Sequence, residues 1–132
     1  MTNKEQIFNA LERLGYKPQY DDDGDIMLRY QLKHIFFLTQ DDDEEHFVSI
    51  ILPQFDDFEE GEESLYLAAC NKMTRETKMT KVYVDQTFKN ISASCEFFYE
   101  NDSTLEMNIK KALCILGVMR TAFRNCVSEL SE

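Results

Sequence analysis

The sequence predicts an α+β fold in which an antiparallel sheet is covered by helices. The main observation is the order of the apolar patterns, which switch between helical and strand periodicity along the chain. They predict one helix, three or four strands, a second helix, two strands and a long C-terminal helix. A second observation is the length of 132 residues, which suits a single domain over residues 1–132. A chain of this size buries a hydrophobic core without disulfides or metal.

The first helix is predicted over Lys4 to Leu14, where apolar residues recur on one stripe. Thr2 or Asn3 can cap its first turn. Gly15 is expected to end the helix, because glycine adopts positive φ at little cost.

Strand-like segments follow this helix. They lie at residues 17–20, 26–30, 34–39 and 46–52. Pro18 marks the first segment as an edge strand, and the acidic run from Asp41 to Glu45 is the predicted loop of a hairpin. Pro53 is expected to close the last of these strands.

The second half of the chain is predicted to contain an acidic connector at residues 54–63, a helix from about Glu62 to Met73, and strands at residues 81–85 and 91–99. Phe55 and Phe58 lie within the connector. An exposed aromatic side chain there would contact a partner, so we expect both residues to bind one. The alternative is that both phenylalanines pack the connector against the sheet.

The final helix is predicted to begin in the run Asn101-Asp102-Ser103, with Asp102 or Ser103 as its cap, and to end near Leu130. Its core face is expected to contain Leu105, Ile109, Ala112, Leu116, Phe123, Val127 and Leu130. A second apolar face contains Met107, Cys114, Ile115, Val118, Ala122 and Cys126. Such a helix must be buried on more than one side. Either the first helix covers the second face, or a second copy does so in a homodimer, with Met107, Cys114, Ile115, Val118 and Ala122 at the interface.

The charge balance points to the class of partner. The chain has 14 basic and 25 acidic residues, a formal charge of −11 and a pI near 4.6. Because such a surface repels phosphates and anionic lipids, we expect neither nucleic acid nor a membrane as partner. Basic proteins or peptides are favoured. Without an apolar leader or membrane span, the domain is expected to be cytoplasmic, with its four cysteines reduced.

No motif identifies a reaction. The cluster from Asp21 to Asp25 fails the EF-hand pattern, because aligning Gly24 with the invariant glycine places Gln19 and Tyr30 at ligand positions. The few glycines form no phosphate-binding loop. We therefore assign no catalytic residue, no cofactor and no metal ligand.

The chain also resembles a known family. The resemblance lies in Leu14-Gly15-Tyr16, Asp23-Gly24-Asp25-Ile26, Leu65-Tyr66-Leu67-Ala68-Ala69-Cys70-Asn71, Lys81-Val82-Tyr83-Val84-Asp85 and Ile91-Ser92-Ala93-Ser94-Cys95-Glu96. These segments resemble YbjN-type sensory transduction regulator domains, which are similar in fold to type III secretion chaperones. The resemblance implies a dimeric α+β sandwich that acts by binding, and it assigns no catalytic residues.

We therefore expect a noncatalytic cytoplasmic domain, chaperone-like or regulatory, that binds a protein or peptide. Exposed strand edges, apolar helix surface and acidic loops would make the contacts. Two alternatives stay open. One is a divalent-metal-dependent enzyme that uses acidic residues, and the other is an acidic inhibitor that mimics nucleic acid.

Overall fold

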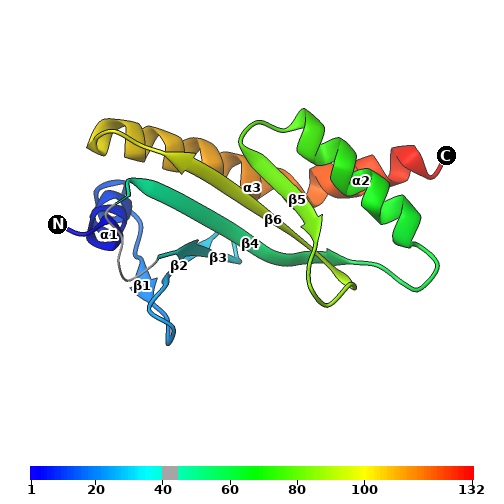
Figure 1. Ribbon diagram of the computed structural model, residues 1–132, viewed down its shortest axis with the longest axis horizontal. Coiled ribbons are helices and arrows are strands. Elements are labelled where there is room, and N and C mark those ends of the chain that lie inside the picture. The colour runs from blue at the N-terminus through cyan, green and yellow to red at the C-terminus, as the bar shows by residue number, and fades with distance from the viewer. Residues whose placement is uncertain (40–44) are drawn as a thin grey trace.

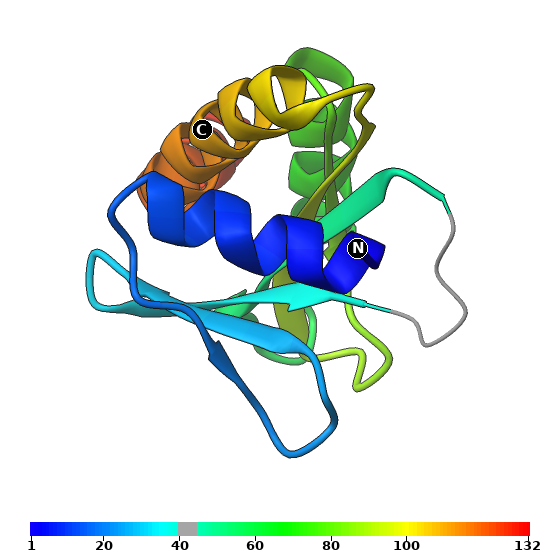
Figure 2. The ribbon, with the colours of Figure 1, turned by 90° about the vertical axis from the view of Figure 1, so that its left-hand side faces the viewer.

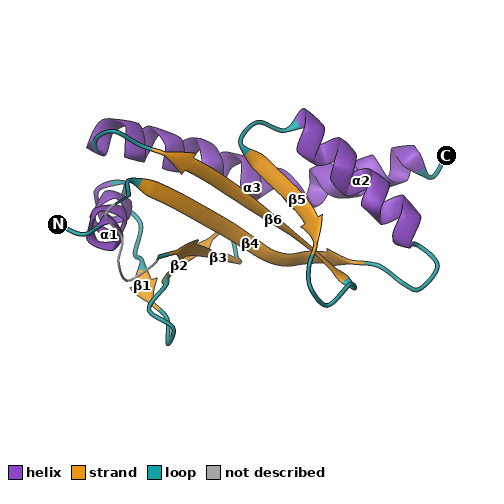
Figure 3. Ribbon diagram, in the orientation of Figure 1, coloured by secondary structure: helices purple, strands orange, loops and turns teal. Residues whose placement is uncertain are grey.

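A computed structural model describes residues 1–39 and 45–132 of the chain. The described residues form three helices and six strands (Figures 1 and 3): α1 (Asn3–Arg13), β1 (Gln19–Tyr20), β2 (Ile26–Tyr30), β3 (Lys33–Leu38), β4 (Phe47–Asp57), α2 (Glu63–Glu76), β5 (Thr80–Val84), β6 (Asn90–Phe98) and α3 (Asp102–Leu130). The predicted α+β order is confirmed, including the fourth strand before α2. Most of the predicted loop at Asp41 to Glu45 lies outside the described residues.

All six strands belong to one antiparallel sheet in the order β1-β2-β3-β4-β6-β5. The three helices lie on one side of this sheet (Figure 2). Burial along β4 follows the strand period, with Val48, Ile50 and Leu52 facing the helices. The core therefore lies between one sheet face and the helix layer.

None of the described helices lies over the other sheet face, which carries some apolar side chains. Phe98 is 65% exposed there and packs against Phe47, with ring centroids 4.9 Å apart. Leu38 is also exposed, and Phe36 lies beside Ile51 across β3 and β4. Ser49 and Glu96 lie between these apolar side chains on the same face.

The prediction that Pro53 ends its strand is wrong, because β4 continues to Asp57. The register between β4 and β6 shifts between Leu52 and Asp56, so Pro53 lies in a bulge where no ladder N–H is needed. The neighbouring Gln54 has a φ of 45°, and its N–H donates to the Ser92 hydroxyl at 2.9 Å. Part of the predicted connector is therefore strand.

The helix ends also differ from some predictions. Thr2 caps α1 as expected, with its hydroxyl accepting from the N–H of Glu5 at 3.1 Å. The cap of α3 is Asn101 rather than Asp102 or Ser103. Asn101 and Thr104 form a reciprocal capping box, which satisfies backbone N–H groups on both sides of the helix start.

The core face of α3 was predicted correctly near its start and wrongly near its end. Its buried residues are Leu105, Ile109, Ala112, Leu113, Leu116, Met119, Phe123 and Cys126. Val127 is only half-buried, and Leu130 is 38% exposed. The reason is that α2 packs against α3 on the side of Cys126 and covers that residue. The Cys126 thiol lies 4.0 Å from the carbonyl oxygen of Ala69 in α2.

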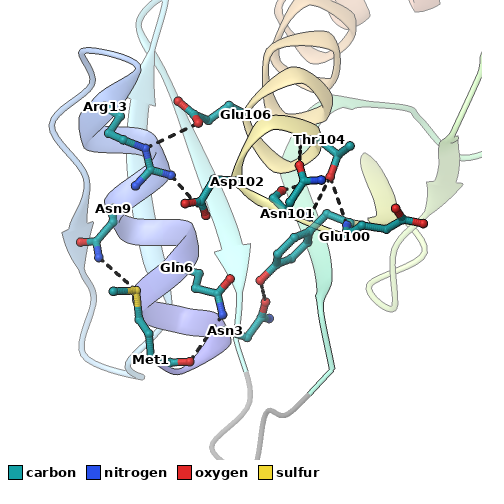
Figure 4. A network of polar contacts seen from close by, with 11 residues as sticks. Met1, Asn3, Gln6, Asn9, Arg13, Glu100, Asn101, Asp102, Thr104 and Glu106 are labelled. Atoms are coloured by element: carbon teal, nitrogen blue, oxygen red, sulfur yellow. Dashed lines mark hydrogen bonds and ion pairs between the residues drawn. The ribbon is translucent and has the colours of Figure 1, made fainter.

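Figure 4 shows how α1 is held at the start of α3. Arg13 lies 3.6 Å from Asp102 and 3.5 Å from Glu106. At the other end of α1, the Tyr99 hydroxyl donates to the side-chain oxygen of Asn3, whose amide donates to the Phe47 carbonyl at 2.7 Å. These contacts place α1 over the first turns of α3.

Candidate peptide-binding groove

An apolar groove runs between α2 and β5. Its volume is about 440 Å³, and its apolar walls are formed by Phe58, Leu67, Cys70, Val82, Val84 and Phe88. Leu67 projects from α2, and Phe88 lies in the turn between β5 and β6. The groove therefore combines a helix surface, a strand at the sheet edge and a hairpin turn.

The edge of β5 is closed at one residue by α2. The Thr74 hydroxyl accepts from the Val82 N–H at 2.8 Å and donates to the Val82 carbonyl at 3.1 Å. Since backbone groups alternate in direction along a strand, those of Val84 also point to this edge. The next residue, Asp85, turns back toward β6 and donates its N–H to Asn90. Val84 therefore offers one N–H and one C=O on the groove side.

Two large apolar side chains at the groove are exposed to solvent. Leu67 is 54% exposed and Phe88 is 77% exposed. Phe88 also has a φ of 60°, in the left-handed region. Glycine or asparagine normally occupies such a turn position, because a bulky side chain is strained there.

Acidic residues predominate around the groove. Glu63 lines it, Glu59, Glu60 and Glu62 come before α2, and Asp85 follows Val84, while Lys89 follows Phe88. The hydrogen bond from the Thr87 hydroxyl lowers the pKa of Asp85, so that carboxylate is charged at neutral pH. An apolar segment with basic neighbours would complement this surface.

The groove also contains a thiol. Burial raises the pKa of Cys70 to about 11, so the side chain is a neutral, apolar part of the wall. Cys95 and Cys126 are buried as well, whereas Cys114 is exposed, and all four cysteines are free.

The two phenylalanines proposed as partner contacts lie in different places. Phe58 lines the groove and stacks on Tyr66, with ring centroids 5.2 Å apart. Phe55 packs edge-on against Phe123 at 5.5 Å, which is the packing alternative. Both are half-buried, and partner contact by either residue stays a prediction. The sequence analysis missed Leu67 and Phe88, although a phenylalanine in a predicted turn was a usable signal.

The residues proposed for a dimer interface lie on the outer side of α3. Met107 is 48% exposed, Val118 is 62% exposed and Cys114 is exposed, while Ile115 and Ala122 are half-buried. Because α1 packs near the start of α3, it leaves Met107, Cys114 and Val118 uncovered. Self-association through this face stays a prediction.

No three His, Cys, Asp or Glu side chains come close enough to hold a metal ion in the part of the chain that the structure describes. In the cluster from Asp21 to Asp25, the Asp21 carboxylate accepts the N–H groups of Asp23 and Asp25, both at 2.9 Å. This is the expected turn chemistry. Of the described helices, none is both long and apolar enough to cross a membrane.

The architecture defines the class of protein: a small α+β domain with one helical layer on an antiparallel sheet. The chain belongs to the YbjN family, whose model is described as "Putative bacterial sensory transduction regulator" and matches residues 3–103. No curated protein matches the sequence.

Two solved structures share the fold. The first is described as "Crystal structure of YbjN, a putative transcription regulator from E. coli"; it has a TM-score of 0.67 and 9% identity, over 92% of this chain and 91% of that one. The second is an uncharacterized protein from Methanothermobacter thermautotrophicus, with a TM-score of 0.54 and 11% identity, over 91% of this chain and 97% of that one. At these identities the likeness concerns the fold only.

Proposed function

We propose that this chain is a noncatalytic regulatory domain of the cytoplasm that binds an extended segment of a partner protein in the groove between α2 and β5. The bound segment carries an apolar side chain flanked by basic residues. The description of the family supports a regulatory role. The mode of binding is our inference from the groove.

Phe88 is the observation that carries this proposal. It is 77% exposed and has a left-handed backbone, so the free protein bears a steric cost and a hydration cost at this residue. Strained, exposed residues of this kind are typical of binding sites. A partner side chain between Phe88 and Leu67 would remove both apolar surfaces from water.

The remaining contacts follow from the geometry. The N–H and C=O of Val84 can pair with one residue of an extended segment, as in strand addition. The Thr74 hydroxyl already bonds the N–H and C=O of Val82, so the bound segment pairs with the strand at Val84 and not at Val82. The side chains of the bound segment set the specificity. Apolar side chains lie against Leu67 and Phe88, and basic side chains point toward Glu63 and Asp85.

The test uses two short fluorescent peptides. In one, valine and leucine alternate with lysine, and in the other, glutamate replaces every lysine. We expect the lysine peptide to bind and to shift the amide NMR signals of Leu67, Val84 and Phe88. Binding of the glutamate peptide is expected to be at least about tenfold weaker. Equal binding of both peptides, or shifts confined to other surfaces, would contradict the proposal.

A pair of matched variants separates binding from folding. Phe88→Asn relieves the left-handed strain and removes the aromatic contact, so we expect unchanged or raised stability and about tenfold weaker peptide binding. Leu32→Asn is the control, because Leu32 is 86% exposed with a φ of 66° in a different turn. Leu32→Asn should leave binding of the lysine peptide unchanged. Equal effects of the two variants on binding would count against the groove.

A further inference from the structure

The long helix α3 differs in charge from the rest of this acidic chain. Residues 107–128 contain no Asp or Glu but contain Lys110, Lys111, Arg120 and Arg124. Arg124 lies 3.6 Å from Asp56, whereas the other three form no ion pair with any residue in the described ranges 1–39 and 45–132. Most of α3 therefore presents uncompensated positive charge.

Apolar side chains lie among these cations. Met107, Lys111, Cys114 and Val118 are spaced three or four residues apart, so they share one helix face. All four are exposed, Val118 by 62% and Met107 by 48%. This face is amphipathic and open to solvent.

The turn between β2 and β3 extends the surface. It packs on α3 at Gly117, where an added Cβ would lie 3.0 Å from the Gln31 amide oxygen and 3.1 Å from the Tyr30 ring. Glycine permits this close approach. The turn brings Leu32 and Lys33 beside Arg120, around a hollow of about 480 Å³. Leu32 is 86% exposed with a left-handed backbone, like Phe88 in the groove.

We infer that this basic face, formed by Met107, Lys110, Lys111 and Val118 of α3 and flanked by Leu32 of the turn, docks an acidic amphipathic helix of a partner protein. Carboxylates would pair with the cations, while apolar side chains would cover Met107, Val118 and Leu32. The inference is independent of the groove, whose surroundings carry the opposite charge.

Charge complementarity favours this occupant over a second copy. The apolar pattern of α3 predicts a twofold contact in which two such faces meet. That contact would bring Lys110 and Lys111 of both copies together, and Glu106, the carboxylate beside them, already lies 3.5 Å from Arg13. An acidic helix provides both the apolar area and the missing charges.

Nucleic acid fits less well than an acidic helix. Phosphates would pair with the cations but would leave Met107, Val118 and Leu32 uncovered.

The test uses two blocked peptides of about 18 residues, long enough to form a helix. One has leucine at helical spacing with glutamate elsewhere, and its control has glutamine in place of every glutamate. Titration into the isotope-labelled chain should shift the amide signals of residues 107–121 and 31–33. The glutamate peptide should bind at least about tenfold more tightly than the glutamine peptide, and salt should weaken its binding.

Variants with equal changes in charge locate the site. The double change Lys110→Gln and Lys111→Gln should weaken binding of the glutamate peptide about tenfold. The control double change Lys78→Gln and Lys89→Gln should have no such effect. Leu32→Asn should weaken binding and Phe88→Asn should not, which reverses the pattern expected for the groove.

Three results would overturn this inference. The first is absence of binding, or equal binding of both peptides. The second is a short DNA duplex that shifts the same amide signals at lower concentration than the glutamate peptide, which would assign the face to phosphates. The third is a dimer in light scattering that Val118→Asp converts to a monomer, which would assign the face to a second copy.

Discussion

Replacing Thr74 by valine is expected to weaken the contact between α2 and the edge of β5. Valine has nearly the shape of threonine and a similar helix propensity, so the change mainly removes the hydroxyl. That hydroxyl makes both hydrogen bonds to Val82, at 2.8 Å and 3.1 Å. The variant therefore leaves one N–H and one C=O at this edge without their partner.

The size of the effect follows from these two groups. A fully buried polar group that loses its partner costs about 1–3 kcal/mol. The seam between α2 and β5 is only partly buried, and water can replace some of the lost interaction. We therefore expect the free energy of unfolding to fall by about 1–3 kcal/mol in total. The urea midpoint should fall by about 1 M, with an unchanged slope.

Thr74→Ser is the matched control, because serine keeps the hydroxyl. Amide hydrogen exchange gives a local readout: the Val82 amide should exchange at least about tenfold faster in the valine variant than in the serine variant. Because valine keeps nearly the shape of threonine, α2 still covers Val82, and the lysine peptide should bind the two variants equally well.

Equal urea midpoints and equal Val82 exchange in the two variants would refute this reasoning. Such a result would mean that the hydroxyl does not hold the edge in solution. Tighter peptide binding by the valine variant would mean that α2 does not cover the edge of β5 at Val82.

Three further predictions concern the core and the alternative functions. Asn3→Ala removes the side-chain amide that links Tyr99 to Phe47, so a urea titration should show the free energy of unfolding fall by about 1–3 kcal/mol. Asn9→Ala is the control, because its amide makes an exposed contact, and it should lower the free energy of unfolding by less than about 1 kcal/mol. Burial raises the pKa of Cys70 to about 11, so the folded chain keeps a proton that the unfolded chain loses between about pH 9 and 11. Stability should therefore fall with rising pH in that window, and urea titrations should show a smaller fall in Cys70→Ala. Calcium, magnesium or manganese at micromolar concentration should not raise the melting temperature, and a clear rise would support the metal-dependent enzyme instead.

The sequence predicted the element order well because apolar periodicity is a strong local signal. It failed where tertiary contacts override local rules. Pro53 was expected to end a strand, but a bulge lets β4 pass it. Val127 and Leu130 were expected in the core, but α2 packs on a neighbouring side of α3 and covers Cys126 instead. Neither the bulge nor the position of α2 is encoded in one local pattern.

The candidate groove was predictable only in part. Phe58 and the acidic connector were identified from sequence, and both border the groove. Closure of the β5 edge by Thr74 requires a helix and a strand to be placed side by side, which no spacing rule gives. The net charge likewise predicted a basic partner for the whole chain. It gave no sign of the basic face of α3, because a net charge sums over all surfaces.

Phe88 and Leu32 connect these observations. Each lies in a turn between two strands, is more than three-quarters exposed and has a left-handed backbone, at 77% and 60° for Phe88 and at 86% and 66° for Leu32. Asparagine or glycine would suit both turns better, so the local sequence opposes the fold at both of them, and Gln31, Gln54 and Met79 also have positive φ. Local conflicts of this kind are expected at functional sites, because binding supplies the stabilisation that folding does not. One turn borders an apolar groove among acidic residues, and the other borders an apolar face among basic residues. The two surfaces would therefore select segments of opposite charge, which would allow one small domain to hold two different partner segments at once.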